Sequence, residues 1–340
     1  MAATRWFRAL ALAGVLLCLV VVVLGAYVRL TAAGLGCPDW PGCYGHITPL
    51  GAVANAADVN AAFPGQPLDV GKAWREMIHR YAATTLGFII VFIAALAIAT
   101  RRARVVPVGF ALALLATVVL QGILGMLTVT WQLKPLIVTA HLVFGLTTLS
   151  LLWWLWLTLR SRDAARDARR DPPRDPPGDT PRTLVLAGLV ALGIQIALGG
   201  WTSSNYAAVA CPDFPRCQDA WVPRMDYRDA FVLWRGLGIN YEGGVLEHPA
   251  RVAIHFTHRL GAIAATLALL LAAWATLRRV TAPAVRRAAI AVIAALGLQL
   301  AIGIFMVLRG FPLALATAHN AGAALLLLAA VALYRSLRPS

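Results

Sequence analysis

The sequence repeats itself: residues 8–160 and residues 182–335 carry the same short motifs in the same order. An internal repeat of this kind predicts two equivalent halves, each with its own pair of histidines. The shared motifs are the cysteine segments CPDWPGC (37–43) and CPDFPRC (211–217), the segments EMIHR (76–80) and HFTHR (255–259), and the segments TAH (139–141 and 317–319) with Gln121 and Gln299 ahead of them. The paired histidines are His79 with His141 in the first copy and His258 with His319 in the second.

The composition places the chain in a lipid bilayer. Hydrophobic residues make up 60% of the chain and charged residues 13%, whereas about a quarter of the residues of a soluble domain are charged. A helix needs about 20 apolar residues to cross the hydrocarbon core. Eight apolar segments are suited to this: 9–28, 77–99, 105–129, 136–159, 184–201, 252–277, 290–308 and 313–334. We therefore predict an all-α integral membrane protein whose eight transmembrane helices form two tandem-repeated four-helix bundles.

The domain organisation follows from the repeat. One bundle is predicted at residues 1–160 and the other at residues 182–340, with a linker at residues 161–181. The linker sequence SRDAARDARRDPPRDPPGDTP is rich in Pro, Asp and Arg, a composition that favours a flexible connector over a packed core. Because each half has an even number of helices, both halves enter the membrane in the same direction.

Arginine distribution predicts the orientation. Basic residues favour the cytoplasmic side of short membrane loops, and an N-terminus inside the cell places all four arginine-rich segments there: 101–104, 160–182, 278–287 and 335–338. We expect a multi-pass protein of the inner (plasma) membrane with both termini in the cytoplasm. Loops 31–75 and 203–250 then lie on the outer face and are long enough to form lids. The net charge of +15 is spread over several loops, which argues against a nucleic-acid-binding protein.

Four of the five cysteines lie in the two outer loops. In an oxidising compartment, two Cys-x5-Cys segments predict the disulfides Cys37–Cys43 and Cys211–Cys217. Their spacing differs from that of the common zinc and thioredoxin motifs. A redox role for these cysteines is a sharper alternative that the sequence leaves open. Cys18, in the first apolar segment, is expected to be a small buried side chain.

The four histidines are predicted to lie at similar depth, in the first turns of helices that descend from the outer face. Ionisable residues inside a membrane are costly and are functional candidates by default. Two imidazoles that face each other across a helical bundle can take the two axial positions of a haem. Copper or zinc bound by histidines alone stays open as an alternative.

Arginines support the haem hypothesis. Arg80 and Arg259 each follow a histidine directly, in register between the repeats, and are predicted to pair with haem propionates. Arg29 and Arg309, near the outer ends of helices, are further candidates for this role.

One carboxylate distinguishes the two copies. Glu76 lies one helical turn before His79, on the same helix face, and its counterpart in the second copy is His255. A di-iron centre needs several carboxylates, and Glu76 is the single glutamate near the apolar segments, so we exclude such a centre. The asymmetry predicts that the first site performs chemistry, with Glu76 handling protons or charge, and that the second holds a permanent cofactor.

Taken together, the EMIHR, THR and TAH motifs and the repeated Cys-x5-Cys loops make the chain resemble the haem A synthase family over all but the linker. The resemblance implies oxidation of the methyl group at position 8 of haem O to a formyl group by successive hydroxylations. The product is haem A for cytochrome oxidase. The geminal diol formed on the way loses water.

The resemblance also implies residue roles. His79 and His141 would bracket the substrate haem O, with Glu76 as the acidic residue important for activity. His258 and His319 would ligate a haem b cofactor. No role is implied for His255.

Two other functions remain as alternatives. A transmembrane di-haem electron carrier resembling cytochrome b561 would place haems near both membrane faces, and a haem transporter or chaperone would bind haem without turnover and without need of Glu76. Beyond haem O and membrane lipid, the candidate partners are haem O synthase, an electron donor and a second copy of the chain.

Overall fold

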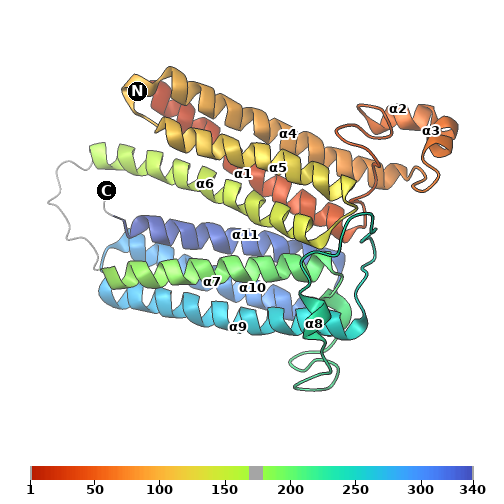
Figure 1. Cartoon of the computed structure of the whole chain (residues 1–340). Helices are drawn as coiled ribbons and strands as arrows, with labels where there is room; N and C mark the ends of the chain where they lie inside the picture. Colours follow the sequence, from red (N-terminus) through yellow and green to blue (C-terminus); the bar gives the residue numbers. More distant parts are fainter. Residues whose placement is uncertain (1, 168–178, 339–340) are drawn as a thin grey trace.

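The computed structural model describes residues 2–167 and 179–338, and in this part of the chain every regular element is a helix (Figure 1). Eight of the helices are long and apolar enough to cross a membrane. They are α1 (Ala2–Leu30), α4 (Val70–Ala99), α5 (Val108–Thr130), α6 (Pro135–Asp167), α7 (Asp179–Ser204), α9 (His248–Arg279), α10 (Pro283–Leu308) and α11 (Leu313–Ser336). The prediction of an all-α, multi-pass membrane protein with eight spans is confirmed.

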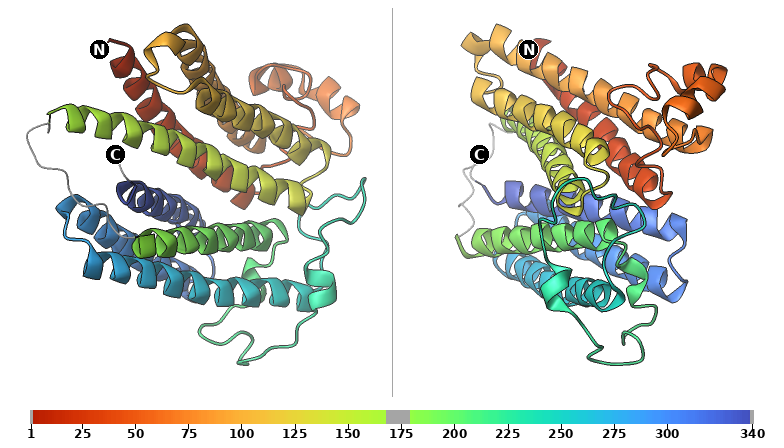
Figure 2. Two further views of the ribbon diagram at one scale, coloured as in Figure 1. Left: turned by 60° about the vertical axis from the view of Figure 1, so that its left-hand side comes forward. Right: turned by 45° about the vertical axis from the view of Figure 1, so that its right-hand side comes forward.

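The long helices pack in two groups. Helices α1, α4, α5 and α6 contact one another, as do α7, α9, α10 and α11. The groups meet where α6 packs on α7 and where α11 packs on α1 and α6. Both further views show the groups side by side, with α1 beginning and α11 ending at the same end of the molecule (Figure 2). The division into tandem-repeated domains at residues 1–160 and 182–340, with separate roles, stays a prediction.

Several helices begin earlier than their apolar segments. Helix α4 begins at Val70 and α9 at His248, so His79 and His258 lie more than two turns inside them and not in the first turns, as the sequence predicted. The hydropathy pattern misses the early turns because they carry polar residues and pack beneath loops. At the start of α4, for example, the Asp69 carboxylate accepts a hydrogen bond from the Lys72 backbone N–H.

The linker is shorter than the predicted 161–181. Helix α6 continues to Asp167 and α7 begins at Asp179, so both ends of the predicted linker are helical. The remainder, residues 168–178, lies outside the described residues. The polar composition that indicated a connector is also compatible with helix ends exposed to water.

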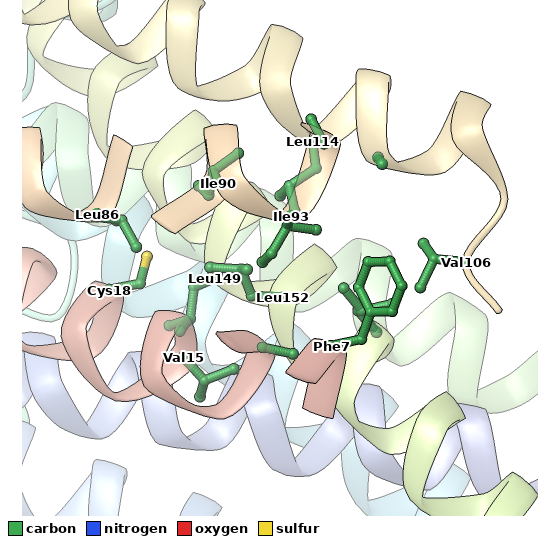
Figure 3. Packing of buried hydrophobic residues seen from close by; sticks show 14 of the residues in the cluster. Phe7, Val15, Cys18, Leu86, Ile90, Ile93, Val106, Leu114, Leu149 and Leu152 are labelled. Atoms are coloured by element: carbon green, nitrogen blue, oxygen red, sulfur yellow. The ribbon is translucent and has the colours of Figure 1, made fainter. Parts of the chain in front are cut away.

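The first group of helices shares a packed apolar core that includes Phe7, Ile93 and Leu149 (Figure 3). Cys18 belongs to this core and is 2% exposed, which confirms its predicted burial. Leu328 of α11 joins the same core, and its carbonyl accepts a hydrogen bond from the Trp153 indole. Lipid is as apolar as these side chains, so close packing rather than escape from water holds the helices together.

The two long cysteine-bearing loops lie at the end of the molecule opposite the last residues of α11 (Figure 1). The first contains the short helices α2 (Pro49–Ala54) and α3 (Ala56–Ala62), and the second contains the turn η2 (Ala208–Ala210) and the short helix α8 (Tyr227–Ala230). A further turn, η1 (Arg101–Ala103), joins α4 to α5 at the other end.

The second cysteine-bearing loop extends over the first group of helices. We call residues 234–242 the crossing segment. Its Tyr241 backbone N–H donates to the Gln132 carbonyl at 3.0 Å. The ammonium of Lys134, which is 1% exposed, donates to the Gly236 carbonyl and lies 3.3 Å from the Trp234 ring centroid. The second half therefore forms part of the outer surface of the first.

Candidate functional site

The structure brings the four histidines together in two pairs. His79 on α4 and His141 on α6 are near enough to interact electrostatically, as are His258 on α9 and His319 on α11. The Nδ1 atoms of His79 and His141 are buried and have no hydrogen-bond partner. A buried ring nitrogen without a partner calls for an explanation, and a bound water or ligand would supply one.

Each imidazole lies against a glycine of a neighbouring helix. A Cβ atom placed on the glycine would lie 3.0 to 3.5 Å from the ring Cε1 atom in all four cases. The glycine and histidine pairs are Gly25 with His79, Gly125 with His141, Gly199 with His258 and Gly303 with His319. A larger residue at Gly25, Gly199 or Gly303 would press against the ring, so these three glycines make room for the imidazoles, whereas a Cβ atom at Gly125 would make ordinary contact.

This arrangement fits a haem better than a bare metal ion. Each pair supplies two imidazoles, and a haem needs no more than two axial ligands because its macrocycle supplies the rest. A structural zinc site takes four protein ligands. Among residues 2–167 and 179–338, no group of three or more His, Cys, Asp and Glu side chains is arranged to hold a metal ion.

Glu76 occupies a buried position beside the first pair. It is 4% exposed, lies on the same face of α4 as His79, and both of its carboxylate oxygens have partners. The Cys37 backbone N–H donates to Oε2 at 2.9 Å, and the Arg80 guanidinium donates to Oε1 at 2.5 Å. The first disulfide loop therefore fixes the position of this carboxylate directly.

Both predicted disulfides, Cys37–Cys43 and Cys211–Cys217, are present. Each closes a loop in which an aspartate carboxylate accepts two backbone N–H groups: Asp39 from Tyr44 and Gly45, and Asp213 from Gln218 and Asp219. Partial burial alone would raise the pKa of Asp213, but these two N–H donors and the nearby Arg259 outweigh it and hold the pKa below its ordinary value.

The structure places Arg80 and Arg259 against these loops. Arg80 Nη1 donates to the carbonyls of residues 39, 41 and 42. Arg259 donates to the carbonyls of Arg216 at 2.7 Å, Asp213 at 2.8 Å and Cys211 at 2.9 Å. The two arginines therefore anchor the disulfide loops to α4 and α9. Their pairing with haem propionates stays a prediction, and it would require them to exchange some of these carbonyls for carboxylates.

His255 takes the place of Glu76 in the second half. Its ring is 4% exposed, and its Nε2 atom accepts a hydrogen bond of 3.4 Å from Arg259 Nε. The ring also lies edge-on to Phe311, with 6.2 Å between ring centroids. Of the other two candidate arginines, Arg29 donates to the Ser203 carbonyl at 2.6 Å and lies over the Tyr206 ring, so it joins the two halves.

Three glutamines near the histidines received no role from the sequence. Gln121, Gln195 and Gln299 each donate an amide hydrogen bond to the backbone carbonyl of a site histidine. The signal that could have identified them is their spacing, since each precedes by four residues a glycine that receives a histidine ring.

Comparisons with known proteins identify relatives along nearly the whole chain. The model of the cytochrome oxidase assembly protein family COX15-CtaA matches residues 8–331. A haem A synthase from Shewanella oneidensis is 40% identical over 313 residues, which cover 92% of this chain and 91% of the relative. Haem A synthases from Rhizorhabdus wittichii and Paracoccus denitrificans are 28% and 29% identical, over 91% and 89% of this chain and 87% and 80% of theirs.

Proposed function

The chain belongs to the COX15-CtaA family of cytochrome oxidase assembly proteins, and from this premise we propose that it is a membrane oxidoreductase that converts haem O to haem A. Its relatives over the full length carry the name haem A synthase. These relatives do not favour the electron carrier or the haem chaperone. The observation in this chain that carries the proposal is a buried, doubly held carboxylate, Glu76, beside one histidine pair and not the other.

In this proposal, haem O binds in the first half as the substrate, between His79 and His141. Gly25 leaves space for the His79 imidazole, and the partnerless Nδ1 atoms fit a site whose rings bind a group from outside the chain. The surrounding helices present apolar side chains, which suits a substrate with a long prenyl tail in the bilayer.

Glu76 holds and returns a proton during the last step. A geminal diol loses water when one hydroxyl gives up its proton and the other leaves with a proton. Glu76 Oε2 accepts a hydrogen bond from the neutral N–H of Cys37, whereas Oε1 is paired with the Arg80 guanidinium, which leaves Oε2 as the oxygen that exchanges the proton. Oε2 therefore accepts the first proton and supplies the second, and the carboxylate ends the step unchanged.

His258 and His319 hold haem b as a resident cofactor in the second half. Their rings face each other's helices across the second half, and Gly199 and Gly303 leave space for them. When bound there, haem b supplies a one-electron redox centre. In this half Gln195 and Gln299 hold the backbone carbonyls of the two histidines, and the second disulfide loop covers the site.

The remaining assignments complete the proposal. The protein lies in the plasma membrane with both termini in the cytoplasm and both disulfide loops outside, where an oxidising compartment maintains the disulfides. Haem O synthase and an electron donor are its proposed partners, and a second copy of the chain is a further candidate.

The test is expression of the chain in cells that make haem O and lack haem A, followed by mass spectrometry of the extracted haems. We expect haem A, or its hydroxylated precursor, with the wild type and neither with Glu76→Ala. A matched control is His255→Ala, which alters the equivalent position of the second half and should leave haem A formation intact. Unchanged haem O in wild-type cells that contain folded protein would refute the proposal.

A further inference from the structure

A groove lies between the first turns of α1 and the last turns of α6, which pack together and lie at the same end of the molecule (Figure 1). Its volume is about 310 Å³, near the lower end of the range for ligand pockets, roughly 300–1,000 Å³. Trp156, in its wall, follows His141 by 15 residues on α6, about 22 Å along the helix. The groove is therefore separate from the histidine sites. It is lined by Arg5, Arg8, Ala9, Leu12, Trp156 and Arg160.

The lining residues form one stripe on each helix. The four residues from α1 are spaced i, i+3, i+4 and i+7, which is the pattern of a single helix face. The two residues from α6 are four positions apart and so share a face as well. Two stripes that border one cavity make a groove with a defined lining from both helices.

Charged and apolar side chains of the groove are separated by depth. Arg5 and Arg8 precede the apolar segment that begins α1, and Arg160 follows the apolar segment of α6. Leu12 and Trp156 lie within these segments. The guanidinium groups are therefore at the level of lipid headgroups, and the apolar side chains are at the level of acyl chains. An occupant that contacts both is anionic at one end and apolar at the other.

Two guanidinium groups of the groove have N–H donors available. Arg5 and Arg160 are exposed, and neither takes part in a hydrogen bond or an ion pair with any residue that the structure describes. The Arg160 guanidinium lies 5.2 Å from the centroid of the Trp156 ring. A guanidinium over an aromatic face keeps its in-plane N–H groups free for an anion. Arg80 and Arg259, in contrast, donate to the carbonyls of the disulfide loops.

The second half does not repeat this set of charges. Counted back from the matched residues Gly25 and Gly199, the position of Arg8 keeps an arginine, but the position of Arg5 is taken by Asp179. A carboxylate at this position would offset one arginine and repel an anion. The preference of basic residues for the cytoplasmic side applies to both halves, so it does not account for three arginines around one groove of the first half.

We propose that the groove binds the phosphate headgroup of an anionic phospholipid, with an acyl chain lying along Leu12 and Trp156. Guanidinium groups match phosphate oxygens in planar, bidentate pairs. Basic pockets between transmembrane helices bind such headgroups on the cytoplasmic side, where the proposed orientation places this groove. The bound lipid connects the beginning of α1 to the end of α6 and so stabilises the first group of helices. This inference goes beyond the proposed haem chemistry and does not depend on it.

The test is native mass spectrometry of the full-length protein in an uncharged detergent, with phosphatidylglycerol compared with phosphatidylcholine of the same acyl chains. We expect the wild type to bind one phosphatidylglycerol in preference. The variant Arg5→Ala with Arg160→Ala should weaken this binding roughly tenfold or more, because each arginine near an anionic lipid contributes about fivefold. The matched control is Arg278→Ala with Arg279→Ala, in the last turn of α9, which removes two arginines outside the groove and should leave this binding unchanged.

Two results would overturn the proposal. Equal affinity for the two lipids, or equal losses in the two double variants, would show that the arginines act only as scattered surface charges. Inorganic phosphate distinguishes the two sources of a phosphate group, and we expect millimolar phosphate to leave the lipid bound. Displacement of the lipid by phosphate would assign the groove to the free anion and overturn the lipid assignment.

A further variant keeps the test decisive if the double variant unfolds. Arg5→Asp copies the second half at one exposed position, and the melting temperature of the lipid-free protein should stay at the wild-type value. Added phosphatidylglycerol should raise the melting temperature of the wild type and not that of Arg5→Asp, because a ligand stabilises the folded state that binds it. A rise of the same size in both proteins would overturn the proposal. These readouts do not involve haem, so they are distinct from the outcome of the synthase test.

Discussion

The first disulfide loop and the second meet their helices through matching contacts. In each, a disulfide closes the loop, an aspartate carboxylate accepts two backbone N–H groups, and an arginine next to a site histidine donates to loop carbonyls. We call these contacts between a disulfide loop and its helix a junction. The two junctions differ in the residue that lies one helical turn before the site histidine. Glu76 receives the Cys37 N–H and the Arg80 guanidinium, whereas His255 contacts Arg259 alone among these groups.

Under the proposed function, the difference marks the half in which chemistry occurs. A shared scaffold needs the disulfide, the aspartate and the arginine in both halves to hold the loops over the helices. Under the proposed function, the carboxylate that only the first half holds is the group that moves protons. We therefore expect changes at Glu76 to affect turnover and changes at the shared contacts to affect loop stability in both halves.

The largest effect is expected from Glu76→His, which turns the first junction into a copy of the second. Loss of a positioned proton-transfer group typically costs 10²–10⁴-fold in rate, so haem A formation should fall by at least about 100-fold. Haem b content should stay at the wild-type level. The measurement is the ratio of haem A to haem O in extracted haems, together with haem b per protein. Near-normal turnover in Glu76→His would remove the functional distinction between the junctions.

The next effect compares the two disulfides. Cys37→Ser with Cys43→Ser should lower turnover by roughly tenfold or more, because the loop no longer fixes the N–H that holds Glu76. Loss of either disulfide should lower the free energy of unfolding by about 2–4 kcal/mol. The variant Cys211→Ser with Cys217→Ser should lose less turnover per folded molecule than the variant of the first loop. Thermal unfolding and turnover normalised to folded protein separate the two. Equal losses of normalised turnover would show that both loops serve the same purpose.

A smaller effect is expected from Arg80→Lys and Arg259→Lys. Lysine cannot reproduce the several hydrogen bonds that each guanidinium makes to loop carbonyls. Both loops should become more open to proteolysis, with several-fold faster cleavage between the cysteines and α4 or α9. Haem content measured on the same samples addresses the propionate prediction. Loss of haem without faster cleavage would favour propionate pairing over loop anchoring.

The smallest effect is a pH dependence confined to Asp213. Its pKa in the folded protein lies below the ordinary value, so its stabilising contribution is complete above the ordinary pKa and is lost as the pH falls through the lowered pKa. The melting temperature of Asp213→Asn should therefore lie slightly below that of the wild type near neutral pH, and the difference should shrink below about pH 4. Melting curves between pH 3 and pH 7 measure this. A difference that grows with acidity would contradict the assigned contacts.

The sequence was sufficient for the number of long helices, the histidine pairs and both disulfides. These depend on apolar length and on motifs that occur twice, and both signals are strong. Helix starts were less predictable, since residues such as Lys72 and Glu76 continue α4 beyond its apolar segment. A window of hydropathy cannot recognise polar turns that are covered by a loop.

The contacts that the arginines and glutamines make could not be predicted from the sequence, for a different reason. The motif order places Arg80 beside His79 but does not show whether its guanidinium points to a ligand or back to the loop. Gln195 has no counterpart in the first half, where Val21 stands, so a search for shared residues overlooks it. Spacing along one helix becomes informative once the neighbouring helix is known.

The crossing segment carries a consequence for biosynthesis. A ribosome makes the chain from its N-terminus, so α1 to α6 are complete before Trp234, Tyr241 and their neighbours exist. The buried ammonium of Lys134 has no indole of Trp234 to lie against until then, and the Gln132 carbonyl has no donor from Tyr241. The earlier half is therefore sealed by the later one, and a chain that stops after α7 leaves its first half without part of its outer cover. Completion of the first half is in this way timed by synthesis of the second.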